Sequence, residues 1–170
     1  MGHYIEAGVA YYQVTGNPKA LDIAIRMADC IANNFGEAEG KIDGYDGHPE
    51  IEIALARLYE VTQKESYKEL LEYFVYRRGH LPTFFDDQVQ ADGFERDMIN
   101  GMNTFPASYF QADVPLLERE TLEGHTVRVV YLCAGMAYLA NINGDKPVRN
   151  FGIISLINVC ILREALVQQI

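Results

Sequence analysis

Helical spacing of the apolar residues is the feature that most restricts what this chain can fold into. Apolar side chains recur every three or four positions in five stretches, namely residues 3–15, 17–34, 49–62, 64–78 and 125–142. This spacing places them on one face of an α-helix. No stretch shows a convincing alternation of apolar and polar residues, the pattern typical of a half-buried strand. The sequence therefore predicts an all-α protein.

Short breaks separate the predicted helices. Gly16 ends the first helix, and Asn17-Pro18 begins the second, with Asn as the N-cap and Pro in the first turn. Asn143-Gly144 ends the last one. The segment Tyr11–Gly16 also resembles Leu58–Gln63, which indicates an imperfect internal repeat. Such helix hairpins stack to bury their faces, and the repeat alone fits either an open solenoid or a closed toroid.

A Gly-His pair opens three of the predicted helices, at Gly2-His3, Gly47-His48 and Gly124-His125. The motif that continues from Gly47 to Arg57 also has acidic residues in its first turn. Capping alone explains a histidine at one helix start, but three occurrences of the pattern favour a shared binding site. The fourth histidine, His80, follows a helix end and is interpreted as a loop residue. We therefore expect His3, His48 and His125 to line one cavity.

Two of these histidines have a carboxylate at helical spacing. Glu6 follows His3 by three residues, and Glu52 follows His48 by four, so each pair is expected to share a helix face. An imidazole beside a carboxylate can position sugar hydroxyls, bind a metal or relay protons. The helix dipole also favours acidic residues in a first turn, so each pair alone fits a purely structural role as well.

Residues 81–113 lack a sustained helical period and mix Phe and Tyr with Asp and Asn. This composition suits a carbohydrate site, with rings for stacking and polar groups for hydroxyls. It suits equally a loop folded over its own aromatic residues. Asp86-Asp87 could supply a glycosidase carboxylate, but adjacent Asp residues in a loop are usually solvated. Residues Leu116–Glu123 are expected to form a short helix.

Charge and cysteine content restrict the partners and the compartment. The net charge is −10, whereas nucleic acids and anionic membranes require a basic face. Cys30, Cys133 and Cys160 lack metal-binding spacing, and the first two, on apolar helix faces, are expected to be buried and inert. Sparse cysteines and no visible signal peptide favour a cytoplasmic protein. The longest apolar run, residues 151–162, is too short to span a bilayer.

The most specific motif is Gly47-His48-Pro49-Glu50-Ile51-Glu52, which is followed by Ala54-Leu55 and Leu58-Tyr59. Further matching segments are Gly2 to Ala7, Val9 to Tyr12, Thr15-Gly16, Leu21 to Ala24, Met27 to Asp29, Gln111-Ala112, Pro115, Glu123 to His125, Val127-Arg128 and Tyr131-Leu132. Together these motifs resemble glycoside hydrolase family 127, the β-L-arabinofuranosidase-like proteins. The resemblance covers roughly residues 2–142.

This resemblance implies an (α/α)6 toroid whose inner helices point their N-termini at the active site. It implies release of a non-reducing-end β-L-arabinofuranose, or a related sugar, with retention of configuration. It also implies that the histidines of the Gly-His openings contact the sugar, a role that falls to His3, His48 and His125. In the family, the nucleophile is a cysteine held with zinc by neighbouring Cys and Glu ligands, and a nearby glutamate is the acid/base.

The chain departs from the family after about Gly144. Residues 1–144 are therefore interpreted as part of a catalytic domain, and residues 145–170 as a divergent apolar tail, for which an out-of-frame origin is the hypothesis. The cysteine and zinc motifs of the family lie beyond the last matching helix, and Cys160 cannot be assigned as the nucleophile. We expect a fragment with no catalytic residue and no metal ligand of its own. Zinc is expected only in the intact family enzyme. Exposed apolar helix faces would promote self-association.

Two other functions stay open. The chain could be a non-catalytic helical-repeat module for binding or scaffolding, whose polar helix openings would be spread along one edge. A toroid of similar architecture could also serve a sugar lyase or epimerase, although the Gly47–Glu52 motif disfavours this. The positions of His3, His48 and His125 relative to one another distinguish the repeat module from the sugar site.

Overall fold

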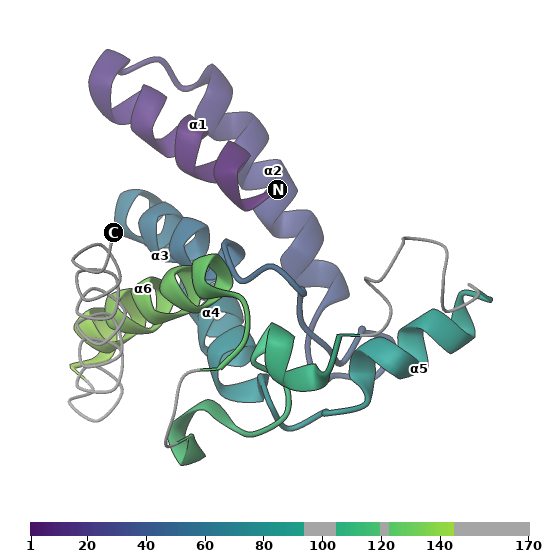
Figure 1. Cartoon of the computed structure of the whole chain (residues 1–170). Helices are drawn as coiled ribbons and strands as arrows, with labels where there is room; N and C mark the ends of the chain where they lie inside the picture. The colour runs from purple at the N-terminus through teal and green to yellow at the C-terminus, as the bar shows by residue number, and fades with distance from the viewer. Residues whose placement is uncertain (94–104, 120–122, 145–170) are drawn as a thin grey trace, which may run out of the picture.

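The computed structural model describes residues 1–93, 105–119 and 123–144. These residues form six α-helices and two short 3-10 helices (Figure 1). The elements are α1 (Gly2–Thr15), α2 (Lys19–Asn34), α3 (Ile51–Thr62), α4 (Glu65–Arg77), α5 (Phe84–Ala91), η2 (Ala107–Phe110), η3 (Leu116–Glu118) and α6 (Thr126–Asn143). The described ranges contain no strand, only an isolated bridge between Phe35 and Ile42. The all-α prediction is confirmed.

The first two helices form the predicted hairpin. Gly16 adopts the left-handed conformation, with φ of 68°, and its N–H donates to the carbonyl of Tyr12. Pro18 has helical dihedral angles, and the Lys19 N–H donates to Asn17 Oδ1 over 3.1 Å. Asn17 therefore caps α2 as expected, because its side chain satisfies a backbone donor that has no partner within the helix.

Helix α3 is the centre of the molecule. It packs against α1, α4 and α6, and Figure 1 shows it between the α1–α2 hairpin and α6. The side chains from Ile51 to Ala56, and that of Leu58, are buried. Gln63 then adopts the left-handed conformation, with φ of 55°, and starts the turn into α4. A helix buried on nearly every side explains why its first residues can hold polar groups in fixed positions.

The end of α4 requires a glycine. Gly79 has φ of 87°, and a Cβ there would lie 2.0 Å from the carbonyl oxygen of Val114. Arg77 lies in the last turn, where a cation complements the helix dipole. Arg78 follows it directly in the sequence, and a cation there would be expected to serve the helix end as well, but its side chain turns inward and is completely buried.

Helix α6 has the predicted extent, and Gly144 ends it in the left-handed conformation. Helical spacing over residues 125–142 also predicts Val127 and Val130 on the buried side of this helix, and that prediction is wrong. These two side chains are 49% and 36% exposed, and the core side is instead formed by Val129, Leu132, Cys133, Met136, Leu139 and Ala140. The helix is apolar around most of its circumference, so apolar spacing alone did not identify the buried face.

The segment expected to lack regular structure contains α5 and η2. No residue of α5 is buried, but its first two rings pack inward. Phe84 lies 5.4 Å from the ring of Tyr45, and Phe85 lies 4.7 Å from the ring of Phe110. These contacts favour a loop folded over its own aromatic residues. The helix predicted over Leu116–Glu123 is present only as η3, and residues 94–104 and 120–122 lie outside the described ranges.

The cysteine prediction is half right. Cys133 is buried in α6, whereas Cys30 is exposed, because it lies on the outer side of α2, where the Asn34 amide donates to its sulfur over 3.8 Å. Cys160 and the proposed 145–170 tail lie outside the described residues. No helix in the described ranges has the length and apolarity that a membrane-crossing segment needs.

Candidate functional site

Glu50, directly before α3, contacts both His3 and His48. Its side chain is 10% exposed, and its Oε2 lies 2.6 Å from His3 Nε2 and 3.8 Å from His48 Nε2. Its Oε1 accepts a hydrogen bond from the His3 backbone N–H over 3.3 Å. The amine of Met1 lies 3.8 Å from the same oxygen. One carboxylate thus fixes groups from two distant segments.

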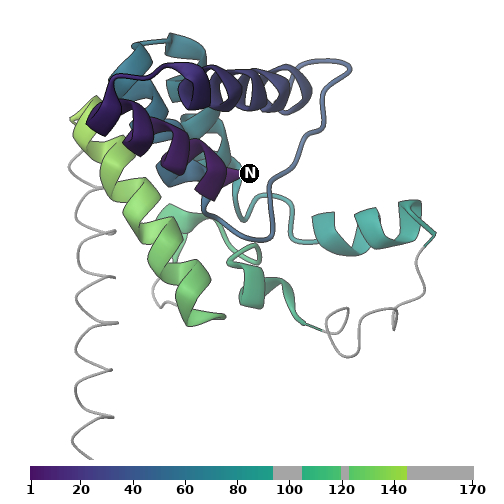
Figure 2. The same cartoon turned by 90° about the horizontal axis from the view of Figure 1, so that it is seen from above.

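The close packing of α1 on the start of α3 depends on Gly2. A Cβ at Gly2 would lie 2.9 Å from Glu50 Cγ and 3.1 Å from the Glu50 carbonyl carbon. Because real Cβ contacts are not this short, the absence of a side chain lets the first turn of α1 approach Glu50. Figures 1 and 2 show the N-terminus of the chain at this junction.

Helix α6 completes the group through Tyr131. The Tyr131 ring centre lies 5.7 Å from that of His3 and 5.7 Å from that of His48. We refer to His3, His48, Glu50 and Tyr131 as the Glu50 cluster. Its members come from α1, α6 and the turn that leads into α3, so the fold brings together residues that are distant in the sequence.

The predicted pairing of His48 with Glu52 is wrong. Helix α3 begins only at Ile51, so His48 lies in the preceding turn and shares no helix face with Glu52. Glu52 is completely buried and forms an ion pair with Arg78 over 3.3 Å. Burial raises the pKa of Glu52, and the positive charge of Arg78 opposes that shift. The other predicted pair is present, since His3 Nδ1 lies 3.8 Å from Glu6 Oε2.

Glu50 is the residue that sequence reasoning missed. It is part of the Gly47–Glu52 motif, but it does not lie at helical spacing from His3 or His48. The contact with His3 arises from packing between α1 and α3, which apolar periodicity does not specify. The only sequence signal was the proximity of Glu50 to His48 within one motif.

His125 occupies the N-cap of α6 and belongs to a neighbouring group of aromatic residues. Its ring centre lies 5.6 Å from that of Tyr109, and its backbone N–H donates to the Tyr109 carbonyl over 3.4 Å. Its Nδ1 is buried and has no hydrogen-bond partner within the described part of the chain. Tyr131 lies six residues further along α6, about 9 Å along the helix axis. The structure thus unites His3 and His48 and gives His125 different contacts.

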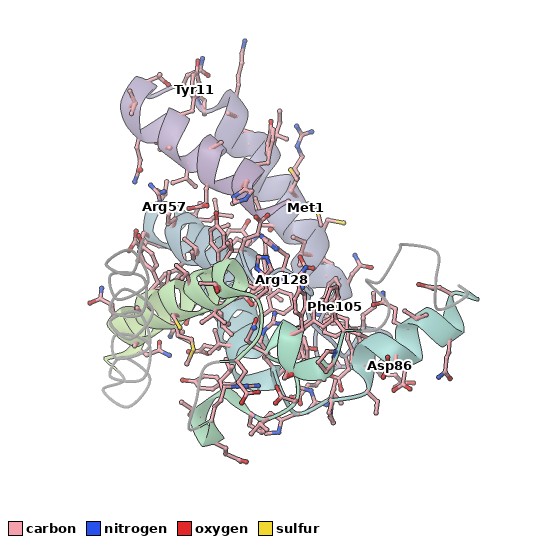
Figure 3. All side chains as sticks on the ribbon, viewed as in Figure 1. Met1, Tyr11, Arg57, Asp86, Phe105 and Arg128 are labelled. Atoms are coloured by element: carbon pink, nitrogen blue, oxygen red, sulfur yellow. The ribbon has the colours of Figure 1, made fainter. Side chains whose placement is uncertain are left out.

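The rings around His125 also contact one another. Phe105 stacks on Tyr109 with ring centres 4.0 Å apart. The Arg128 guanidinium lies 4.9 Å from the Tyr109 ring centre and 4.8 Å from that of Phe110, in the middle of the molecule (Figure 3). These faces are therefore already covered by protein groups. Asp87, in the first turn of α5, accepts a hydrogen bond from the Thr83 hydroxyl and takes no part in the Glu50 cluster.

An apolar cavity of about 270 Å³ lies beside the Glu50 cluster. Gly2 and Gly47, the residues preceding His3 and His48, form part of its wall. Its other lining includes Phe35, Tyr45, Phe74, Phe84 and Phe85. His3, His48, Glu50 and Tyr131 do not belong to this lining, so the cavity adjoins the cluster only through neighbouring residues.

Within the described residues, the donor atoms of His3, His48 and Glu50 are the group that could hold a metal ion. These atoms lie within 4.8 Å of one another. Two imidazoles and a carboxylate suit a transition metal. The zinc site implied by the family resemblance has cysteine ligands instead, and it does not fit here. Cys30 is exposed on α2 and Cys133 is buried in α6, and neither contributes to this group.

Comparison with known proteins places the sequence motifs in a family. A model of the β-L-arabinofuranosidase GH127 catalytic domain matches residues 1–152. The non-reducing end β-L-arabinofuranosidase of Bifidobacterium longum subsp. longum is 49% identical over 146 residues. That match covers 86% of this chain and 22% of the relative, so the chain spans about a fifth of the protein it matches.

Solved structures agree with this result. The GH127 β-L-arabinofuranosidase Ara127N of Geobacillus stearothermophilus T6 matches with a TM-score of 0.80 and 43% identity, over 89% of this chain and 23% of that one. The GH127 β-arabinofuranosidase BT3674 matches with a TM-score of 0.73 and 32% identity, over 92% and 21%. The six helices therefore correspond to part of the (α/α)6 barrel, and the toroid prediction is confirmed over the solenoid.

Proposed function

Because the chain belongs to the GH127 β-L-arabinofuranosidase family, we propose that it supplies sugar-binding residues of a GH127 cavity. The proposed ligand is a non-reducing-end β-L-arabinofuranoside, or a related sugar. The observation that carries the proposal is the convergence of His3 and His48 on the buried carboxylate of Glu50.

The cluster suits a small polyol. His3 Nε2 faces Glu50, and its Nδ1 and Glu6 Oε2, 3.8 Å apart, offer polar atoms for a hydroxyl. His48 presents a second imidazole, and Tyr131 adds a ring next to both. His125, at the start of the same helix as Tyr131, is the third proposed sugar ligand, with a buried Nδ1 that has no partner in the described structure.

The proposal assigns binding, not bond cleavage, to these residues. Cys30 and Cys133 are not members of the group formed by His3, His48 and Glu50, and the proposal assigns no nucleophile. We expect the chain alone to release no aryl alcohol from an aryl β-L-arabinofuranoside. Turnover that survives both zinc chelation and thiol alkylation would contradict the assignment.

Histidine NMR tests the binding directly. The imidazole Cε1–H signals are followed while methyl β-L-arabinofuranoside is added to the full chain. Saturable shifts at His3 and His48 with a Kd of about 1–10 mM are expected, since an isolated part of a cavity binds weakly. His3→Gln and His48→Gln should each weaken the response, whereas His80→Gln, on an exposed residue, should not.

Two further controls separate this proposal from its competitors. Methyl β-D-galactopyranoside should produce no saturable shift, because its ring size and stereochemistry differ. A chelator should leave sugar binding unchanged; loss of binding on chelation would favour metal coordination by His3, His48 and Glu50. Absence of any saturable shift at these histidines would refute the sugar site and favour a non-catalytic scaffold role for this part of the toroid. The cytoplasmic location inferred from cysteine usage stays a prediction.

A further inference from the structure

The buried ion pair between Arg78 and Glu52 lies beneath the loops that carry the proposed sugar ligands. We propose that Arg78 is a positioning residue. It holds the His48 loop (residues 45–49) and the loop beside His125 (residues 106–111) in fixed positions relative to α3, and Glu52 balances the charge of Arg78. This inference rests on the proposed sugar site for its functional meaning, although its geometry stands independently.

Arg78 contacts three different segments at once. Its side chain is completely buried, and its Nη2 lies 3.3 Å from Glu52 Oε1 in α3. The same nitrogen donates to the carbonyl of Asp46 over 2.8 Å, and Nη1 donates to the carbonyl of Phe110 over 3.1 Å. Its guanidinium also lies 4.8 Å from the ring centre of Tyr45. A single planar group therefore connects α3 with two loops that are more than 60 residues apart.

The first connection leads to His48. Arg78 fixes the Asp46 carbonyl, and the Asp46 side chain accepts the His48 backbone N–H over 3.1 Å. Only Gly47 separates the two residues. Moving the Asp46 carbonyl would thus move the turn that orients the His48 ring toward Glu50.

The second connection leads to His125. Arg78 fixes the Phe110 carbonyl, which adjoins Tyr109. The Tyr109 carbonyl accepts hydrogen bonds from the His125 backbone N–H and from Gln111 Nε2. The Tyr109 ring packs on the His125 ring. The position of Phe110 therefore sets the surface on which His125 rests.

Arginine and glutamate are both required by this arrangement. The guanidinium offers five N–H donors in a fixed plane, whereas lysine offers a single ammonium that cannot reach both carbonyls and Glu52 with the same geometry. A buried guanidinium without a counter-charge is strongly unfavourable, which gives Glu52 its role. Helix α6 confines Glu52 from the other side, because a Cβ at Gly135 would lie 2.6 Å from Glu52 Cβ.

Hydrogen exchange tests the inference on the full chain without sugar. In Arg78→Lys, amide hydrogen exchange should increase about tenfold or more in segments 45–49 and 106–111. Local opening of these segments becomes easier, because it no longer has to break hydrogen bonds to Arg78. The α1–α2 hairpin should change less than about twofold. Glu52→Gln should loosen the same two segments together and serves as the second variant if Arg78→Lys does not fold. Arg77→Lys, whose native side chain pairs with surface Asp43, should leave segment 106–111 unchanged.

Spectroscopy separates positioning from general stability. In Arg78→Lys and Glu52→Gln, the imidazole signals of both His48 and His125 should move, and affinity for methyl β-L-arabinofuranoside should fall at least about tenfold, the loss of one charge-assisted contact. Equal loosening of the hairpin and both loops, or no loosening of the loops, would overturn the positioning role. If the wild-type chain binds no sugar while both loops still respond, the proposed function fails and the positioning role stands.

Discussion

His3 Nε2 lies 2.6 Å from Glu50 Oε2, although the two residues are 47 positions apart in the sequence. The same carboxylate oxygen lies 3.8 Å from His48 Nε2. A nearly buried Glu50 therefore sets the orientation of one imidazole directly and influences the other. Contacts across the interface between α1 and α3, and not the local helix start, create the candidate site.

Replacing the carboxylate should impair sugar binding more than folding. Glu50→Gln keeps the shape of the side chain but removes the charge that accepts from His3, so we expect about a tenfold loss of affinity for methyl β-L-arabinofuranoside. The His3 and His48 imidazole signals should move even without sugar. Glu60→Gln, on an exposed position of α3, is the control and should behave as wild type. An unchanged affinity in Glu50→Gln would remove Glu50 from the site.

Alanine in place of glycine should destabilise the protein in one Gly-His motif and have little effect in another. Gly2→Ala places a methyl group 2.9 Å from Glu50 Cγ and 3.1 Å from its backbone carbonyl carbon, so the helix start must shift. Overpacking of this kind costs about 1–3 kcal/mol in the free energy of unfolding. At Gly47 the nearest atoms would lie 3.4–3.6 Å away, and Gly47→Ala should change stability by less than about 0.5 kcal/mol. Urea unfolding measures both, and equal effects would contradict the packing argument.

Apolar spacing predicted most of the helices because their faces and caps are local features. The ends of α1, α2 and α6 followed from Gly16, the Asn17 cap and Gly144. Spacing did not identify the buried side of α6, since apolar residues surround most of that helix. Short α5 was missed because an eight-residue helix with no buried residue has no repeated apolar stripe.

The candidate site was predictable only in part. His3 and His48 were identified from the repeated Gly-His motif, and the structure brings them together. Spacing pairs His48 with Glu52, but that residue is two positions beyond Glu50 and points into the core toward Arg78. Identifying Glu50 as the partner of both histidines requires knowing where α3 begins and how α1 packs against it. Neither is specified by residue spacing within a single helix.

Exposed aromatic and aliphatic residues on α1 should drive self-association of the chain. Tyr4, Tyr11 and Val14 are 45%, 48% and 86% exposed, and their spacing places them on one face. Figure 3 shows Tyr11 at the outer end of the α1–α2 hairpin. The net charge of −10 opposes association, so added salt should promote it by screening.

Sedimentation equilibrium tests this prediction. The double variant Tyr11→Lys/Val14→Lys should stay monomeric at concentrations where the wild-type average mass increases. Ile42→Lys provides a control, because Ile42 is 50% exposed but lies in the loop after α2. Identical self-association of wild type and double variant would show that the α1 face is not the contact surface.

The pair formed by Asp43 and Arg77 should make stability depend on acidic pH. Arg77 Nε donates to Asp43 Oδ1 over 2.8 Å, and the Tyr73 hydroxyl lies 3.0 Å from the same oxygen. The hydrogen bond from Arg77 holds the pKa of Asp43 below its ordinary value of 3.8. A lowered folded-state pKa adds stability above the unfolded-state value, and that stability disappears as the pH falls through the folded-state value.

Asp43→Asn should therefore be less stable than wild type at about pH 6 and should approach wild type at about pH 2.5, below the unfolded-state value. The difference at the higher pH should be under about 1 kcal/mol, because the Asp43 side chain is 40% exposed and solvent screens the pair. Urea unfolding at both pH values measures it, and a double-mutant cycle with Arg77→Gln isolates the pair. High salt should shrink the coupling. The asparagine variant has no charge at this position at any pH, whereas wild type has it only at the higher pH. An equal difference in unfolding free energy at both pH values would therefore mean that the charge of Asp43 contributes nothing.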